Sequence, residues 1–213
     1  IKQLVKPFDV VIELGSNIGS HTVPIAQLVP EGLVYAFEPQ NIIFENLCAN
    51  ISINSLTNCT CEKLAISNSN TDEFYAWKVD FSKPNNYGAN NLQTSKNNFN
   101  YSVPIETLDN KFSDLKSLKL LKMDIEGMEL NALKGGENLI KRTQPFLYLE
   151  NDGKGENSKK LIEYLCNLDY KLYWHRIRMF SKNNFFKSQR NIFGKQVSSN
   201  MLGIPKKIDV DVQ

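Results

Sequence analysis

The chain has 213 residues, of which 25 are Lys or Arg and 23 are Asp or Glu, so its formal net charge is +2. Hydrophobic residues make up 41% and charged residues 23%, which is typical of a globular protein and excludes a wholly disordered one. No apolar run approaches the roughly 20 residues that span a bilayer, so we expect no membrane span. The length suits one domain, taken as residues 1–213.

The cysteines and histidines show no metal-binding or redox spacing, because no CxxC pair occurs. They are Cys48, Cys59, Cys61, Cys166, His21 and His175. We expect reduced cysteines and therefore a cytoplasmic protein, with Cys59 and Cys61 on one face of a strand. The sequence begins at Ile1 and not at a methionine, which leaves room for a longer natural N-terminus.

Strands and helices alternate in the first third of the chain. Continuous apolar runs predict the strands, and apolar residues at helical spacing predict the helices. In chain order, these elements are expected at 8–14, 19–29, 33–37, 41–53 and 59–66. Short apolar runs of this kind are typical of a parallel sheet that is covered on both faces.

The asparagine-rich stretch 67–100 interrupts this order. We expect it to be an insertion near the mouth of the active site, with a short strand at 73–79. Beyond it, strands are predicted at 118–125, 146–150, 170–174 and 201–204, and helices at 130–142 and 158–167. We expect the last two strands to form an antiparallel hairpin at the edge of the sheet. The sequence therefore predicts a Rossmann-like α/β fold, a doubly wound and mostly parallel sheet with an antiparallel edge strand.

The segment after the first predicted strand has two glycines four residues apart, Gly15 and Gly19, where open α/β sheets bind their ligands. Dinucleotide-binding loops have a further glycine in the middle, which admits a pyrophosphate, and here that position is Asn17. Glu13 precedes the loop, and its carboxylate would repel a phosphate but suit a cation. S-adenosylmethionine carries a sulfonium and an ammonium and no phosphate, so the loop favours this cofactor over NAD.

Glu38 closes the second predicted strand, where a carboxylate can accept hydrogen bonds from both ribose hydroxyls of a nucleoside. The alternative is an ordinary acid near a helix N-terminus. His21 either lines the cofactor pocket or caps the first helix together with Thr22. The residues expected to bind the cofactor are Glu13, Gly15, Ser16, Asn17, Gly19, His21, Thr22, Glu38, Pro39, Ala65, Ile66 and Asp124.

Several segments resemble the FkbM family of methyltransferases. The matching segments are IELGSNIG at 12–19, FEP at 37–39, IETLD at 105–109, LKMDIEGME at 121–129 with ALKGG at 132–136, PFLYLE at 145–150 and NMLGIP at 200–205. The resemblance implies a class I methyltransferase fold, S-adenosylmethionine as cofactor and O-methylation as the reaction. The chain departs from the family in lacking a longer segment before the glycine loop and in having Glu13 where Asp is frequent. It also has Asn151 and Asp152 after Glu150, in place of an acid-x-His pattern.

Three acids lie at or just after the end of the predicted strand at 118–125, namely Asp124, Glu126 and Glu129, and we expect them to be the catalytic residues. In strand geometry Asp124 and Glu126 would point to one side. Carboxylates this close raise one another's pKa, which suits a general base for a hydroxyl acceptor, and Glu126 is expected to face the substrate. Asp124 could instead bind the cofactor, and Glu129 could offset a helix dipole. With Glu150, Asp124 and Glu126 could hold Mg²⁺ or Ca²⁺, although nothing in the spacing demands a metal.

The segment 171–195 contains seven Lys or Arg, no acid and six aromatic residues. This mixture fits nucleic acid, anionic glycans or phosphorylated sugars, or else aromatic residues that pack the edge strands beneath solvated charges. We therefore expect an O-methyltransferase that acts on a hydroxyl of a sugar, glycan or secondary metabolite. The acceptor would then be a small molecule or glycan, anionic if the basic segment binds it. The alternatives are an RNA or cap methyltransferase and a non-catalytic module that binds S-adenosylmethionine; the oligomeric state stays open.

Overall fold

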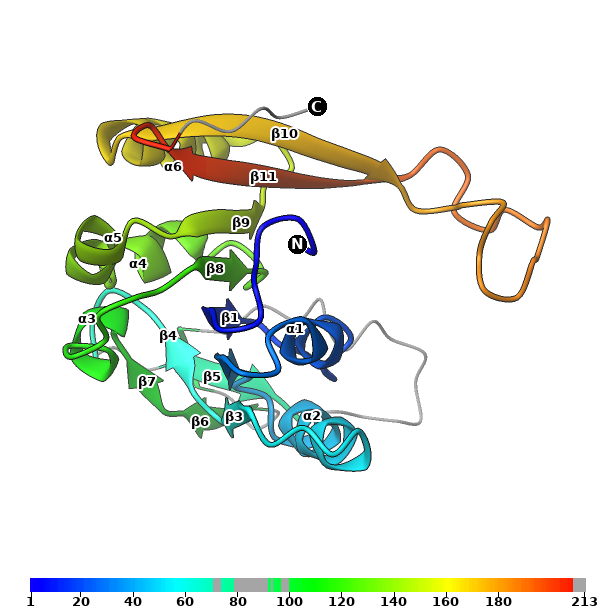
Figure 1. Ribbon diagram of the computed structural model, residues 1–213, viewed down its shortest axis with the longest axis horizontal. Helices are drawn as coiled ribbons and strands as arrows, with labels where there is room; N and C mark the ends of the chain where they lie inside the picture. Colours follow the sequence, from blue (N-terminus) through cyan, green and yellow to red (C-terminus); the bar gives the residue numbers. More distant parts are fainter. Residues whose placement is uncertain (71–73, 79–91, 93, 97–99, 209–213) are drawn as a thin grey trace.

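A seven-stranded sheet forms the centre of the computed structural model, which describes residues 1–70, 74–78, 92, 94–96 and 100–208 (Figure 1). Its strands lie in the order β10-β11-β9-β8-β1-β2-β3. Their bounds are Val10–Leu14 for β1, Leu33–Phe37 for β2, Cys59–Glu62 for β3, Leu120–Met123 for β8, Phe146–Glu150 for β9, Tyr170–Arg178 for β10 and Val197–Pro205 for β11. The strands from β9 to β3 are parallel, and β11 is antiparallel to both of its neighbours.

Helices cover both faces of this sheet. On one face lie α3 to α6, and on the other lie α1 and α2 (Figure 1). Their bounds are Thr22–Leu28 for α1, Asn41–Ile53 for α2, Leu108–Lys111 for α3, Glu129–Lys134 for α4, Glu137–Thr143 for α5 and Gly155–Asn167 for α6. Two small sheets complete the described part, β4 (Ala65–Ile66) with β7 (Ile105–Glu106) and β5 (Phe74–Trp77) with β6 (Asn100–Val103).

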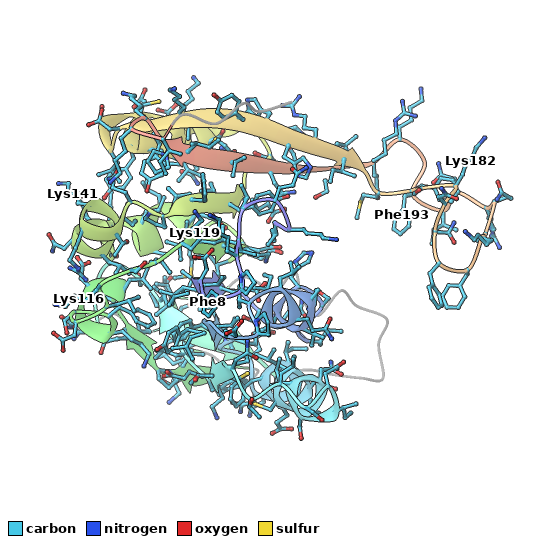
Figure 2. The ribbon with its side chains drawn as sticks, in the orientation of Figure 1. Phe8, Lys116, Lys119, Lys141, Lys182 and Phe193 are labelled. Carbon is cyan, nitrogen blue, oxygen red and sulfur yellow. The ribbon has the colours of Figure 1, made fainter. Side chains whose placement is uncertain are left out.

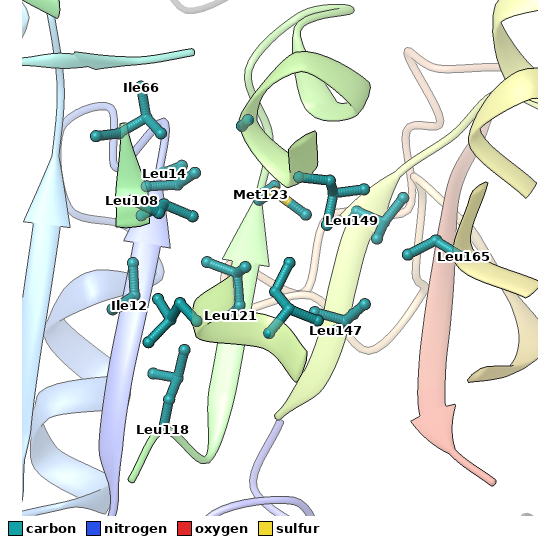
Figure 3. Close-up of a cluster of buried hydrophobic side chains, with 14 of the residues drawn as sticks. Ile12, Leu14, Ile66, Leu108, Leu118, Leu121, Met123, Leu147, Leu149 and Leu165 are labelled. Carbon is teal, nitrogen blue, oxygen red and sulfur yellow. The ribbon is translucent and has the colours of Figure 1, made fainter. Parts of the chain in front are cut away.

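Each central strand sends apolar side chains to both faces. Ile12 and Leu14 of β1 point into the larger core with Leu121 of β8 (Figure 3). Val11 of β1 instead joins the core beneath α1. All four residues are at most 1% exposed. Because successive side chains of a strand alternate between faces, a strand covered on both sides must be apolar throughout. The predicted Rossmann-like fold with a mostly parallel sheet and an antiparallel edge hairpin is therefore confirmed.

Two predicted elements are divided in the structure. The predicted strand 59–66 ends at Glu62, and Ala65–Ile66 pairs with β7 instead. The ladder between β2 and β3 stops because its next N–H group, that of Gln40, donates to the Glu38 carboxylate. The predicted helix 130–142 breaks at Gly135 and Gly136. A Cβ on Gly135 would lie 2.0 Å from the carbonyl oxygen of Ser67, so the chain packs there at a distance that only glycine allows.

The second of these two helices receives a cap from a distant residue. Asp109 accepts hydrogen bonds from the backbone N–H of Asn138 at 3.1 Å and of Leu139 at 2.8 Å, in the first turn of α5. A carboxylate at this position satisfies donors that have no partner within the helix. Asp109 belongs to the IETLD segment, so this motif is explained by its contact with α5.

The C-terminal hairpin is longer than predicted, because 170–174 and 201–204 extend to the nine-residue strands β10 and β11. The prediction that Cys59 and Cys61 share a face is confirmed, with their Sγ atoms 3.9 Å apart. Part of the predicted strand 73–79 appears as β5, while residue 73, residue 79 and most of 67–100 lie outside the described residues. Within the described part, no helix is both long and apolar enough to cross a bilayer.

Candidate active site

The loop after β1 is held against the ends of the neighbouring strands. The backbone N–H groups of Gly15 and Ser16 both donate to the carbonyl oxygen of Phe37, each at 3.0 Å. Gly15 has a φ of +76°, and a Cβ there would lie 1.9 Å from the carbonyl oxygen of Asp124. The predicted need for glycine at this position therefore has a physical cause, which is the close approach of the β1 loop to the end of β8.

Glu38 joins the loop to the start of α2. Its carboxylate accepts hydrogen bonds from the backbone N–H of Asn17 at 3.0 Å and of Gln40 at 2.9 Å. The side chain is buried, and burial raises the pKa of Glu38, an effect that these two hydrogen bonds partly offset. The side chain of Gln40 also hydrogen-bonds this carboxylate. A carboxylate has about four acceptor positions, so one remains for a ligand hydroxyl.

A cavity lies beside Glu38, at the carboxyl ends of β1, β2 and β8. Its lining is mainly apolar, with the carboxyl groups of Glu38, Asp124 and Glu126 at its border. The lining residues are Leu14, Gly15, Phe37, Glu38, Pro39, Gln40, Leu64, Ala65, Ile66, Leu92, Asp124, Ile125, Glu126 and Met128. Apolar walls suit the adenine and carboxylates suit the ribose and the ammonium, so these residues fit S-adenosylmethionine. Leu92 belongs to the stretch 67–100.

Glu13 does not line this cavity, which corrects its expected role beside the ammonium of the cofactor. The side chain is completely buried and points to the α1 face, where its Oε1 lies 3.0 Å from Nζ of Lys122. Thr22 donates its hydroxyl to the other carboxylate oxygen at 2.5 Å. Because Glu13 and Lys122 are neighbours across β1 and β8, the carboxylate is already neutralised within the fold.

The other loop residues that were expected to bind the cofactor make contacts within the protein. Ser16 is buried and its hydroxyl donates to the carbonyl oxygen of Glu13 at 3.3 Å. Gly19 has a φ of +90° and packs on Leu47 of α2. His21 occupies the N-cap position of α1 but makes no side-chain capping hydrogen bond, and it is not among the residues that line the cavity. Its contact with the cofactor stays a prediction.

The acids after β8 lie on a tight turn. The strand ends at Met123, so the predicted strand geometry for Asp124 and Glu126 was wrong. Glu126 has a φ of +52°, in the left-handed region that non-glycine residues rarely adopt, and Gly127 follows with a φ of +92°. Glu129 closes the turn, because its carboxylate accepts a hydrogen bond from the backbone N–H of Ile125 at 3.1 Å.

This turn brings three carboxyl groups together, and we call Asp124, Glu126 and Glu150 the acidic trio. One oxygen of each lies within 4.8 Å of the others. Burial raises the pKa of Glu126, and the charges of Asp124 and Glu129 raise it further. Burial together with Asp124 and Glu126 raises the pKa of Glu150 to about 7. The raised pKa values of Glu126 and Glu150 suit these two carboxyl groups to proton transfer.

A second cavity of about 580 Å³ opens on the other side of the trio, between the β8 turn, the end of β9 and α6. Glu126 lines both cavities. The lining of this second cavity is mainly polar, and most of its residues were not predicted. Besides Glu126, they are Gly127, Glu129, Leu130, Asn131, Glu150, Asn151, Asp152, Lys154, Asn157, Ser158 and Leu161. The polar residues Asn151 and Asp152, directly after a buried strand, were the signal that could have indicated it.

The mostly parallel sheet, with the loop packed against Asp124 at its carboxyl edge, has the Rossmann-like fold of class I methyltransferases. Residues 13–172 match the family model described as the methyltransferase FkbM domain, and the chain belongs to this family. The 2-O-methyltransferase NoeI of Sinorhizobium fredii is 27% identical over 169 residues, which cover 70% of this chain and 66% of that protein.

Solved methyltransferase structures share the fold. The FkbM methyltransferase of Methylobacillus flagellatus has a TM-score of 0.61 at 16% identity, over 93% of this chain and 44% of that one. A precorrin-6y C5,15-methyltransferase of Geobacter metallireducens has a TM-score of 0.58 at 12% identity, over 95% and 84%. Aeropyrum pernix fibrillarin, solved with bound S-adenosyl-L-methionine, has a TM-score of 0.54 at 10% identity, over 94% and 68%.

The substitution Glu38→Gln is expected to weaken binding of S-adenosylmethionine by about ten-fold, because hydrogen bonds to a charged acceptor contribute about 1.5–3 kcal/mol and the amide is uncharged. Isothermal titration calorimetry measures the effect. Glu45→Gln, on α2, is the control and should bind like the wild type. Unchanged affinity of the Glu38 variant would contradict the assignment of Glu38 to the ribose.

Proposed function

We propose that this protein transfers a methyl group from S-adenosylmethionine to a hydroxyl of a sugar, glycan or secondary metabolite. The observation that carries the proposal is the position of Glu126, which lines both cavities and lies beside Glu150, whose pKa is raised to about 7. The cavity beside Glu38 would hold the cofactor, and the polar cavity would hold the acceptor. A non-catalytic module would have no use for carboxyl groups between two cavities.

The cofactor would be held by Glu38 at the ribose, by Leu64, Ala65 and Ile66 at the adenine, and by Asp124 near the amino-acid portion. When bound, S-adenosylmethionine supplies an electrophilic methyl group, whose bond to sulfur breaks as its bond to the acceptor oxygen forms, which leaves S-adenosylhomocysteine. The protein contributes the alignment of the two reactants and the removal of one proton.

Glu126 is the proposed general base. The acceptor hydroxyl would donate its proton to the Glu126 carboxylate as the oxygen is methylated, and the neighbouring Glu150 and solvent would then take that proton away. Glu129 is a positioning residue, because it bonds the turn at Ile125 and so holds Glu126 in its left-handed conformation. This proposal revises the expectation that all three acids after β8 are catalytic.

The acceptor cavity supports a polyhydroxyl ligand. Asn131, Asn151, Asp152, Asn157 and Ser158 offer donors and acceptors around its wall, while Leu130 and Leu161 add apolar surface. Its volume is in the range typical of small-molecule sites, about 300–1,000 Å³. The related NoeI is a 2-O-methyltransferase, which agrees with transfer to oxygen.

A panel of acceptors tests the proposal directly. Purified protein with S-adenosylmethionine is expected to form S-adenosylhomocysteine in the presence of free or glycosidic sugars, and NMR of the product would place the new methyl group on oxygen. A panel of amine and thiol compounds is the comparison. Methylation of nitrogen or sulfur alone would overturn the assignment to hydroxyl acceptors and leave the methyltransferase class intact.

The rate of methyl transfer is expected to rise with pH through about 7 and then level off, because Glu150, which takes the proton from the base Glu126, must be deprotonated and its pKa is raised from 4.5 to about 7. In Glu150→Gln the trio has one carboxyl group fewer, so the midpoint of the kcat/KM profile should move to lower pH. Because the pKa of Glu150 is raised in the native fold, the free energy of unfolding should fall as the pH rises from about 4.5 to 7. A wild-type kcat/KM profile without a step near pH 7 would contradict this role of the trio.

A further inference from the structure

The hairpin of β10 and β11 continues beyond the sheet as a projecting arm, defined here as residues 174–200. Figure 2 shows it extending from the body, with Lys182 and Phe193 on its outer part. The strands are paired as far as Arg178 and Val197, and residues 179–196 connect them. The family match ends at residue 172, so the arm lies beyond the matched domain.

The arm exposes large apolar side chains. Phe185 is 91% exposed and Phe186 is 85% exposed, and the two rings touch edge to face with centroids 5.2 Å apart. Further along the arm, Ile177, Met179 and Ile192 are each about half exposed or more. Exposing so much apolar surface to water is energetically unfavourable, so these side chains indicate a binding surface.

Local hydrogen bonds fix the tip that carries the two phenylalanines. Asn184 donates its side-chain N–H to the carbonyl oxygen of Ser188 at 2.7 Å and accepts from the backbone N–H of Ser188 at 3.1 Å. Phe185, Phe186 and Lys187 lie within this closed loop. These bonds close the tip on itself, and both phenylalanine side chains stay exposed.

The charge of the arm has one sign. Six Lys or Arg and no acid occur in it, and they are Arg176, Arg178, Lys182, Lys187, Arg190 and Lys195. All six are exposed. A cationic segment that also presents phenylalanine, isoleucine and methionine has the chemistry of a segment bound to the interface of an anionic membrane.

The arm leaves the molecule at the edge where the active site lies. In the sheet Asn200 of β11 pairs with Glu150, the acid that closes β9, and the backbone N–H of Asn151 donates to the carbonyl oxygen of Ser199 at 3.2 Å. Because β10 and β9 are both antiparallel to β11, β10 runs in the same direction as β9. The carboxyl end of β10, where the arm begins, therefore projects outward beyond the carboxyl edge of the parallel strands. A surface bound by the tip would therefore face the same side of the protein as both cavities.

We propose that the arm docks the protein on the surface of an anionic phospholipid bilayer, with Phe185 and Phe186 inserted at the interface and the basic residues on the headgroup phosphates. Single-stranded nucleic acid is bound mainly by aromatic stacking, but the arm also exposes the aliphatic side chains of Ile177, Met179 and Ile192, which cannot stack with bases. Exposed isoleucine and methionine also fit acyl chains and not phosphates. This inference goes beyond the proposed function and does not depend on the acceptor.

Vesicle co-sedimentation of the full chain tests the proposal. The protein should bind vesicles of phosphatidylcholine with phosphatidylglycerol, bind vesicles of phosphatidylcholine alone poorly, and dissociate as salt is raised. The double change Phe185→Ala with Phe186→Ala should lower the partition coefficient at least about ten-fold, because both rings lose their apolar burial. Lys182→Glu with Lys187→Glu should lower it similarly through lost attraction to anionic lipid.

Matched controls come from the body, where Phe8 is 70% exposed and Lys116 is exposed (Figure 2). Phe8→Ala and Lys116→Glu should bind vesicles like the wild type, and all variants should keep their affinity for S-adenosylmethionine. Absence of vesicle binding, or equal binding by the Phe185 and Phe186 variant, would overturn the proposal. So would arm-dependent binding of an RNA oligonucleotide, or arm-dependent self-association in sedimentation velocity, without vesicle binding.

Discussion

Replacing Glu126 with Gln is expected to lower kcat/KM for methyl transfer by about 10²- to 10⁴-fold, the usual contribution of a positioned general base. The amide keeps the size of the side chain but cannot take a proton from the acceptor hydroxyl. Affinity for S-adenosylmethionine should change by less than about three-fold, because the change removes an interaction that matters chiefly in the transition state. Steady-state kinetics and calorimetry together measure both quantities.

The control for this variant is Glu163→Gln, an exposed position on α6, which should keep full activity. A Glu126 variant with wild-type kcat would refute its role as the base and direct attention to Glu150. Loss of wild-type turnover in a chelator, restored by added Mg²⁺, would instead assign the acidic trio to a divalent cation.

Replacing Lys122 with Met is expected to lower the free energy of unfolding by about 3–5 kcal/mol, because it leaves a buried carboxylate without its partner. Glu13 is completely buried and Lys122 is 3% exposed, so water cannot take the place of the ammonium. Urea unfolding followed by circular dichroism measures the change. The effect on methyl transfer should be smaller, since neither side chain lines a cavity.

The double variant Glu13→Gln with Lys122→Met tests the cause. Removing the carboxylate charge together with its partner should restore a large part of the lost stability, since the penalty belongs to the unpaired charge. Lys116→Met, at an exposed position, should stay within about 0.5 kcal/mol of the wild type. A double variant as unstable as Lys122→Met alone would show that the lost lysine packing dominates, and not the charge.

The strands of the sheet were predictable because the pattern that defines each one lies within a few consecutive residues. Runs such as 33–37 and 146–150 are apolar throughout, and this pattern occurs when both faces of a strand are covered. The helix at 130–142 was predicted without its break, because the break depends on the approach of Ser67 to Gly135, and no local pattern shows that contact. Likewise, the division of 59–66 depends on a pairing with β7, about 40 residues away along the chain.

The candidate site was predictable where its residues directly follow predicted strands. Gly15, Glu38 and Asp124 follow strand ends, and parallel strands bring such residues to one edge. The role of Glu13 was missed because its partner Lys122 is more than 100 residues away, although a lysine inside the apolar run 120–123 was a signal of a buried acid. The acceptor cavity depends on how α6 packs beside β9, which spacing along the sequence does not determine.

The order β10-β11-β9 has a consequence for how the protein folds as it leaves the ribosome. β11 is synthesised after β10 but lies between β10 and β9, so the open edge of β9 has no partner until residues 197–205 emerge. Until then β9 offers unpaired backbone groups and an apolar edge, the kind of surface that recruits chaperones or aggregates. Strand β11 therefore completes the sheet beside Glu150, and this edge of the candidate active site forms late in synthesis.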